Sequence, residues 1–146
     1  MRLPLLALAL LAVAACSNPG ETPRSEVPPL AASAVLGGVD LGQPLRAIGT
    51  EPFWGVEITP GTLTYSAVDN PGFSVTNPGP TLQGTTAVYA AAGADGATLV
   101  VTLIATDCSD GMSDRVYPLT ARVELGEQTL NGCAASVAFL ESQPAP

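Results

Sequence analysis

The sequence predicts a small all-β domain: an antiparallel barrel of about eight strands, with a two-sheet sandwich as the alternative. Short runs rich in β-branched and aromatic residues fill the chain from residue 46 to residue 140. Apolar and polar residues alternate within several of these runs, and a period of two indicates half-buried strands. Glycine, proline, asparagine and aspartate separate the runs, as tight turns require.

Eight runs carry the strand pattern. In chain order they are RAIGT (46–50), WGVEIT (54–59), TLTYSAV (62–68), FSVTN (73–77), GTTAVYAAA (84–92), ATLVVTLIAT (97–106), VYPLTARVEL (116–125) and QTLNGCAA (128–135). The run 97–106 is apolar on both faces, so we expect a central strand there. AASAVLGG (31–38) would form at most a turn or two of helix. A calycin-like, up-and-down barrel would close on itself and leave no exposed sheet edge.

The first 15 residues are predicted to be a signal peptide. Arg2 precedes the apolar run 3–13, which is too short to cross a bilayer core of about 30 Å as a helix. The run ends in Val13-Ala14-Ala15-Cys16, which resembles a bacterial lipobox. We expect palmitate-type acyl chains on Cys16 to anchor the protein in a membrane, with an incidental cysteine after an ordinary signal as the alternative. Ser17 favours the outer membrane, facing the periplasm.

Composition divides the mature chain into three segments. Residues 16–45 are rich in proline and are expected to be the lipidated cysteine and a disordered tether. The β-domain would follow over 46–140 and a short disordered tail over 141–146. The whole chain carries 13 acidic residues against five arginines, a formal net charge of −8. The negative electrostatic potential of such a chain disfavours binding to nucleic acid and favours cations or a basic protein partner. A need for solubility explains the acidic composition more simply.

Missing residue types exclude several classes of enzyme. The sequence has no histidine and no lysine, so neither a Ser-His-Asp triad nor a Schiff-base lysine can be built. A histidine-containing zinc site is excluded for the same reason. We therefore expect no catalytic residues, no metal and no cofactor. Carboxylate chemistry, a hard cation, or binding without chemistry are the classes that remain.

Cys108 and Cys133 are expected to form a disulfide, because an exported domain matures in an oxidising compartment. A thiol pair for a metal or redox role is the alternative, and the absence of a C-x-x-C motif counts against it. The closed loop of about 26 residues would stabilise the domain by about 3.5 kcal/mol in the chain-entropy model. The bond would tie the segment after Asp107 to the last strand.

The segment DCSDGMSDRVYP (107–118) has two interpretations. Asp107, Asp110 and Asp114 are spaced so that they could wrap one hard cation, although the alternating acids of a Ca²⁺ loop are missing. We favour the second interpretation, in which Asp110 and Asp114 cap backbone N–H groups in Asx-turns. Gly111 would then supply a position with positive φ.

A second candidate feature combines this segment with the strand start at EPFW. An ion pair between Glu51 and Arg115 would join the two. Trp54 would either line a binding surface or fill the barrel, and we favour the second role. The candidate binding rim is defined as Glu51, Trp54, Asp110, Met112, Asp114, Arg115 and Tyr117.

Two segments, RAIGTEPFWGVEI (46–58) and CSDGMSDRVYPLTARVELGEQTLNGCA (108–134), resemble a group of uncharacterised proteobacterial envelope lipoproteins. The layout resembles more loosely the membrane-bound inhibitors of C-type lysozyme, which are lipoproteins with an eight-stranded barrel and a disulfide. Their Ser, Gly, Tyr and Trp–Lys inhibitory motif is absent here. The resemblance implies an anchored cell-envelope protein and no particular activity. The predicted anchor, the tether and the missing catalytic residue types favour a non-catalytic binding or structural role. Lysozyme-type inhibition and carriage of a small ligand or cation remain the alternatives.

Overall fold

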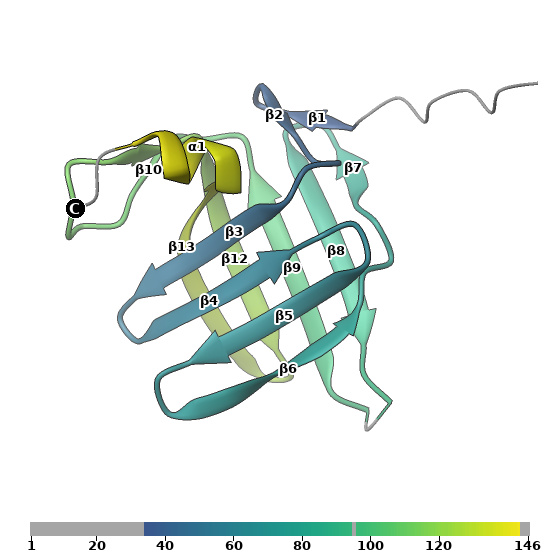
Figure 1. Cartoon of the computed structure of the whole chain (residues 1–146). Helices are drawn as coiled ribbons and strands as arrows, with labels where there is room; N and C mark the ends of the chain where they lie inside the picture. The colour runs from purple at the N-terminus through teal and green to yellow at the C-terminus, as the bar shows by residue number, and fades with distance from the viewer. Residues whose placement is uncertain (1–33, 95, 144–146) are drawn as a thin grey trace, which may run out of the picture.

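An antiparallel sheet of nine strands, curled into a half-barrel, dominates the computed structural model, which describes residues 34–94 and 96–143 (Figure 1). The strand order is β6-β5-β4-β3-β13-β12-β9-β8-β7. The strands are β3 (Leu45–Thr50), β4 (Phe53–Ile58), β5 (Thr62–Ala67), β6 (Asn70–Thr76), β7 (Thr81–Gln83), β8 (Thr86–Ala92), β9 (Thr98–Ile104), β12 (Leu119–Leu125) and β13 (Gln128–Ser136). The predicted all-β fold is therefore confirmed.

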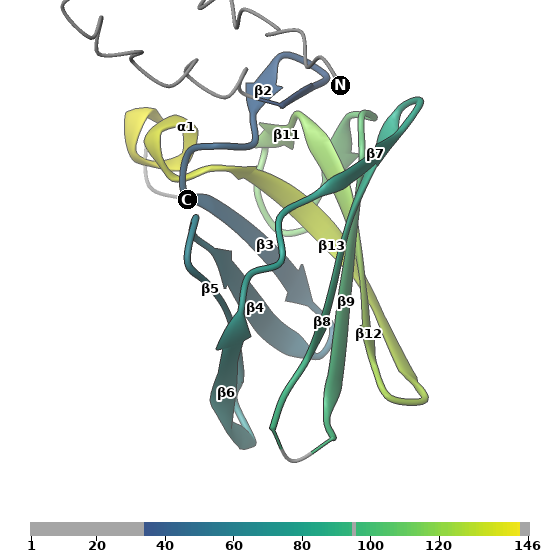
Figure 2. The ribbon, with the colours of Figure 1, turned by 90° about the vertical axis from the view of Figure 1, so that its right-hand side faces the viewer.

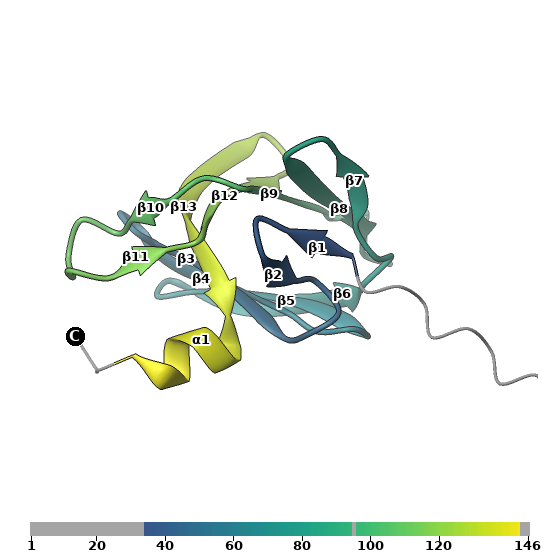
Figure 3. The same ribbon diagram turned by 90° about the horizontal axis from the view of Figure 1, so that it is seen from above.

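Two short hairpins and one helix complete the described part of the chain. They are β1 (Val35–Leu36) with β2 (Val39–Asp40), β10 (Cys108–Ser109) with β11 (Val116–Tyr117), and α1 (Val137–Ser142). Seen from above, β1 and β2 lie over the end of the half-barrel, while α1 and the β10–β11 hairpin lie to one side (Figure 3). Among the described helices, none has the length and apolar character needed to cross a membrane.

All eight predicted strand runs coincide with strands. The run 97–106 contains β9, which is paired on both sides, with β8 and β12, as expected for a central strand. The helical turn suggested for 31–38 is wrong in its described part, because Gly37 and Gly38 have positive φ and turn the chain into the β1–β2 hairpin. Helix α1 was not expected. Its six residues are too few for a visible period, and Ser136 caps it by accepting from the Phe139 amide.

The described domain begins and ends outside the predicted limits of 46 and 140. Strands β1 and β2 and the first residue of β3 lie in the segment predicted as tether. Helix α1 continues to Ser142, within the segment predicted as tail. The β1–β2 hairpin belongs to the domain because Leu36 and Leu41 are buried in its core.

Strands β6 and β7 remain as edges of the sheet, although full closure was expected. Figure 2 shows the two walls of the half-barrel facing each other across the core, with β3–β6 on one side and β8, β9 and β12 on the other. Strand β6 contacts β8, but within the described residues no hydrogen-bonded ladder joins them. Pro71 in β6 lacks an N–H group, and β7 has only three residues, two features that protect edges from pairing with other chains.

Trp54 fills the core at the junction of β3 and β13. Its side chain is 5 % exposed and lies across two glycines. A Cβ atom at Gly49 would overlap the indole nitrogen, and one at Gly132 would overlap both the indole ring and the carbonyl oxygen of Ile48. The structural role favoured for Trp54 is therefore confirmed, and the glycines of the GTEPFW and NGC segments are explained by close packing.

Candidate functional site

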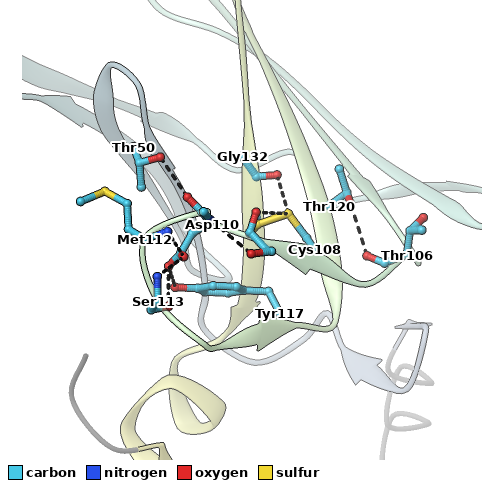
Figure 4. The surroundings of a disulfide bond; sticks show 12 residues. Thr50, Thr106, Cys108, Asp110, Met112, Ser113, Tyr117, Thr120 and Gly132 are labelled. Carbon is cyan, nitrogen blue, oxygen red and sulfur yellow. Dashed lines mark hydrogen bonds between the residues drawn. A yellow bond between two sulfur atoms is a disulfide. The ribbon is translucent and has the colours of Figure 1, made fainter.

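A second, smaller core lies on the outer face of the half-barrel. Tyr117 from β11 packs with Cys133 and Ala135 of β13, and Phe139 and Leu140 of α1 pack against them. The predicted disulfide between Cys108 and Cys133 is confirmed and ties the β10–β11 hairpin to the last strand (Figure 4). The hairpin is thereby fixed at both of its strands, so its loop is held on a rigid base.

Asp110 organises this loop through both carboxylate oxygens (Figure 4). Its Oδ1 accepts from the amides of Met112 at 2.9 Å and Ser113 at 2.8 Å. Its Oδ2 accepts from Ser113 Oγ at 2.8 Å and from the Tyr117 hydroxyl at 3.0 Å. These bonds, led by that from the Ser113 amide, lower the pKa of Asp110 from 3.8 to about 2. The predicted Asx cap at Asp110 is confirmed, and Gly111 has the expected positive φ of 72°.

The other aspartates of the segment behave differently. The predicted cap at Asp114 is wrong, because its carboxylate accepts no backbone hydrogen bond from a described residue; the neighbouring Ser113 Oγ accepts from the Arg115 amide. Nor do Asp107, Asp110 and Asp114 converge on one point: among the described residues, acidic and sulfur side chains form no group of three that could hold a metal ion. The carboxylate of Asp110 instead stabilises the loop by accepting hydrogen bonds.

The structure brings the two halves of the candidate rim together. Thr50 Oγ1 at the end of β3 donates to the Asp110 carbonyl oxygen at 3.1 Å. A hollow of about 360 Å³ lies at this junction and is lined in part by Glu51, Ser109 and Asp110; we call it the Asp110 hollow. The link between the segments is thus a neutral hydrogen bond formed by Thr50, which was not among the predicted residues.

The expected ion pair between Glu51 and Arg115 is not formed. The ion pairs within the described ranges are Arg46–Glu57 and Arg122–Glu124. The Arg115 guanidinium lies 5.9 Å from the centre of the Tyr117 ring, within the range of a cation–π contact. Tyr117 in turn is 1 % exposed, so the side chains of both Trp54 and Tyr117 are buried beneath the rim.

Two exposed apolar residues beside the rim were missed. Phe53 is 54 % exposed and Val68 is 78 % exposed. The alternation of β4 contained the signal for Phe53, because a strand that points Trp54 inward must point its neighbour outward. Val68 occupies the β5–β6 turn, where alternation makes no prediction.

Phe53 and Val68 border a shallow groove on the outer face of β3, β4 and β5. Its floor is the cross-strand row in which Gly55 pairs with Ile48 on one side and Ser66 on the other. The groove measures about 490 Å³ and is mainly apolar; we call it the Gly55 groove. Its lining is Ile48, Gly49, Thr50, Phe53, Trp54, Gly55, Ser66, Ala67 and Val68. It shares Ile48, Gly49 and Thr50 with the Asp110 hollow, so the two concavities are neighbours.

Fold and site together define a class of protein: an antiparallel half-barrel with an external, disulfide-tied hairpin beside an apolar surface groove. No protein-family model, curated protein or solved structure matches the chain.

Proposed function

We propose that the protein is a lipid-anchored cell-envelope protein with a non-catalytic binding role, and that the Gly55 groove with the adjacent Asp110 hollow is its binding surface. The observation that carries this proposal is the exposure of Phe53 and Val68 on either side of a concave, mainly apolar lining. Exposed apolar residues gathered around a groove mark interaction sites, and aromatic residues are enriched at protein interfaces. The disulfide-tied hairpin supplies a rigid border.

The chemistry available at the surface supports binding rather than catalysis. The four hydrogen bonds accepted by the Asp110 carboxylate stabilise the ionised form that holds the loop. General acid–base catalysis at neutral pH needs a group whose pKa lies near the working pH, whereas the pKa of Asp110 is displaced in the opposite direction. The sequence contributes no histidine or lysine to replace it.

The lipid anchor is proposed from the sequence, since Cys16 lies outside the described residues. The geometry of the described part is compatible with it. In Figure 1 the β1–β2 hairpin, where the described chain begins, and the β5–β6 turn, which carries Val68, lie towards opposite ends of the half-barrel. An anchor before β1 would therefore be attached at the end of the half-barrel opposite the β5–β6 turn.

Site-specific photocrosslinking in the intact envelope tests the binding role. Benzoylphenylalanine is placed at position 53 or 68 of the lipoprotein, the cells are irradiated, and adducts are identified by mass spectrometry. Leu82 on β7 is the matched control, since it is also exposed and apolar but lies outside the groove. We expect one envelope protein to be captured from positions 53 and 68 and not from 82. Equal capture from all three positions would contradict the proposal.

The anchor has its own test. Metabolic labelling with a palmitate analogue should label the wild-type protein, and Cys16→Ala should abolish the label and release the protein from the membrane fraction. Membrane association unchanged in Cys16→Ala would refute lipidation at this residue.

Two alternative functions each have one supporting observation. For inhibition of a lysozyme, the observation is the net charge of −8, which suits binding to a basic enzyme. Unchanged muramidase activity with excess protein would exclude this function.

For carriage of a small ligand, the observation is the Tyr89 hydroxyl. It is the buried side-chain polar atom that lacks a hydrogen-bond partner among the described residues, and a ligand inside the half-barrel would supply one. Native mass spectrometry of the periplasmically produced protein would exclude that role if the protein carries no adduct.

A further inference from the structure

We infer that the Gly55 groove receives an apolar side chain from a basic segment of a partner protein, with acidic residues of two neighbouring turns contacting the flanking basic residues. This inference rests on the proposed binding role and names the chemistry of the partner. It is carried by the glycine at the groove floor, the apolar walls and the charges beside them.

The fold itself does not require a glycine at position 55. Its φ lies outside the left-handed region, and a Cβ atom there would meet Ser66 Oγ at 3.7 Å and the Ala47 carbonyl oxygen at 3.8 Å, which are ordinary contact distances. Gly49 and Gly132 differ, because a Cβ atom at either would overlap Trp54. A glycine inside a strand weakens the strand, and such residues often mark a close approach by a ligand or another chain. Gly55 keeps the groove open.

The walls of the groove suit one large apolar side chain. Phe53 stands at the start of β4 and Val68 in the β5–β6 turn, and the half-buried Ile48 and Ala67 complete the apolar lining. Covering these residues removes apolar surface from water, which favours binding. An aromatic or long aliphatic residue of the partner would provide that cover.

The charges closest to the groove along the chain are acidic. Glu51 stands two residues before Phe53, and Asp69 directly follows Val68. Both are exposed, and neither forms an ion pair or side-chain hydrogen bond with another described residue. One row further along the sheet, Arg46 is paired with Glu57 at 2.6 Å, so this arginine is already neutralised.

The hairpin side carries both signs of charge. Asp110 and Asp114 are acidic, and the Arg115 guanidinium lies over the Tyr117 ring. Glu51 in the β3–β4 turn and Asp69 in the β5–β6 turn stand at the same end of the sheet, next to the groove residues Phe53 and Val68. Neither carboxylate is paired within the described residues, so together they favour lysine or arginine beside the inserted residue.

An NMR titration with a defined peptide tests the inference on the full mature protein. The probe is acetyl-Gly-Arg-Trp-Arg-Gly-amide, followed through the backbone amides of the ¹⁵N-labelled protein. We expect saturable shifts centred on Gly55, Ser66 and Val68, with weak affinity that falls further when salt is raised. The peptides Gly-Glu-Trp-Glu-Gly and Gly-Arg-Ser-Arg-Gly should each bind at least tenfold more weakly. Equal binding of the glutamate peptide would overturn the basic specificity.

A side chain introduced at Gly55, in the floor of the groove, tests most directly whether the groove receives a partner residue. Gly55→Val places a side chain where the inserted residue would lie, and we expect at least a tenfold loss of affinity with the amide spectrum of a folded protein. Gly61→Val is the matched control, because Gly61 lies in the β4–β5 turn with open space around it and no positive φ. Wild-type affinity in Gly55→Val would overturn the inference. Val68→Ser repeats the test at a position whose residue is 78 % exposed.

The double variant Glu51→Gln/Asp69→Asn tests the role of the acidic residues. It should weaken peptide binding several-fold at low salt and remove most of the salt dependence of the affinity.

The proposed binding role and the inferred basic partner can be refuted separately. If positions 53 and 68 capture an envelope protein but the arginine peptide does not bind, the binding role stands and the basic partner is refuted. If neither result appears, both are refuted.

Discussion

Asp110→Asn tests how the β10–β11 loop is held. The substitution keeps the oxygen that accepts from the Met112 and Ser113 amides. It replaces the other oxygen, which accepts from Ser113 Oγ and the Tyr117 hydroxyl, with an NH₂ group that cannot accept. It also removes the negative charge. The variant should therefore be less stable than the wild type at neutral pH and should lose the pH dependence contributed by this carboxyl group.

The magnitude follows from the pKa of Asp110. A fall from 3.8 in the unfolded chain to about 2 in the folded protein corresponds to about 2.4 kcal/mol of unfolding free energy. Because this carboxylate is partly in contact with solvent, screening reduces the contribution, and we expect about half, ~1.2 kcal/mol. A group with a lowered folded-state pKa stabilises the protein above its unfolded pKa. The contribution is present above about pH 4 and is lost progressively as the pH falls through 2.

The difference in unfolding free energy between wild type and Asp110→Asn can be measured by urea unfolding at pH 7, 4, 3 and 2. The fluorescence of the single tryptophan, the buried Trp54, reports the transition. The gap in unfolding free energy between wild type and Asp110→Asn should narrow by about 1 kcal/mol from pH 7 to pH 2. Asp114, which is exposed, provides the control. Asp114→Asn should change the free energy of unfolding by no more than about 0.5 kcal/mol at any pH. A gap for Asp110→Asn that stays constant with pH would refute the role assigned to the carboxylate.

Three further variants test the packing and the disulfide. Tyr89→Phe removes a buried hydroxyl that has no partner among the described residues and whose pKa burial raises to about 12; thermal unfolding should show unchanged or slightly higher stability, and a loss above about 1 kcal/mol would reveal a missed hydrogen bond. Gly132→Ala forces a Cβ atom into the Ile48 carbonyl oxygen and the Trp54 ring; denaturant titration should show a loss of about 3 kcal/mol, against less than about 1 kcal/mol for Gly61→Ala. Replacing both Cys108 and Cys133 with alanine opens a loop of sequence separation 25; unfolding free energy should fall by about 3.5 kcal/mol, and a change below about 1 kcal/mol would contradict the chain-entropy account.

The sequence by itself determined the local features of this protein. Runs of β-branched and aromatic residues between turn residues, several of them with a period of two, located every long strand of the sheet, because these patterns belong to neighbouring residues along one chain. Asp110 and Gly111 predicted their turn for the same reason, since the cap and the positive φ depend on residues one to three positions apart. The disulfide followed from the count of cysteines and from the oxidising compartment that the predicted signal peptide implies.

Only the tertiary structure decided which strands meet and what they enclose. Strand β3 lies between β4 and β13, and this pairing places Trp54 on Gly49 and Gly132. The same pairing aligns Gly55 with residues of two other strands to form a groove floor. Contacts of this kind join residues that are far apart in sequence, and their free energy depends on the register of several strands at once. No local pattern contains that information, so the groove was visible only once the sheet was assembled.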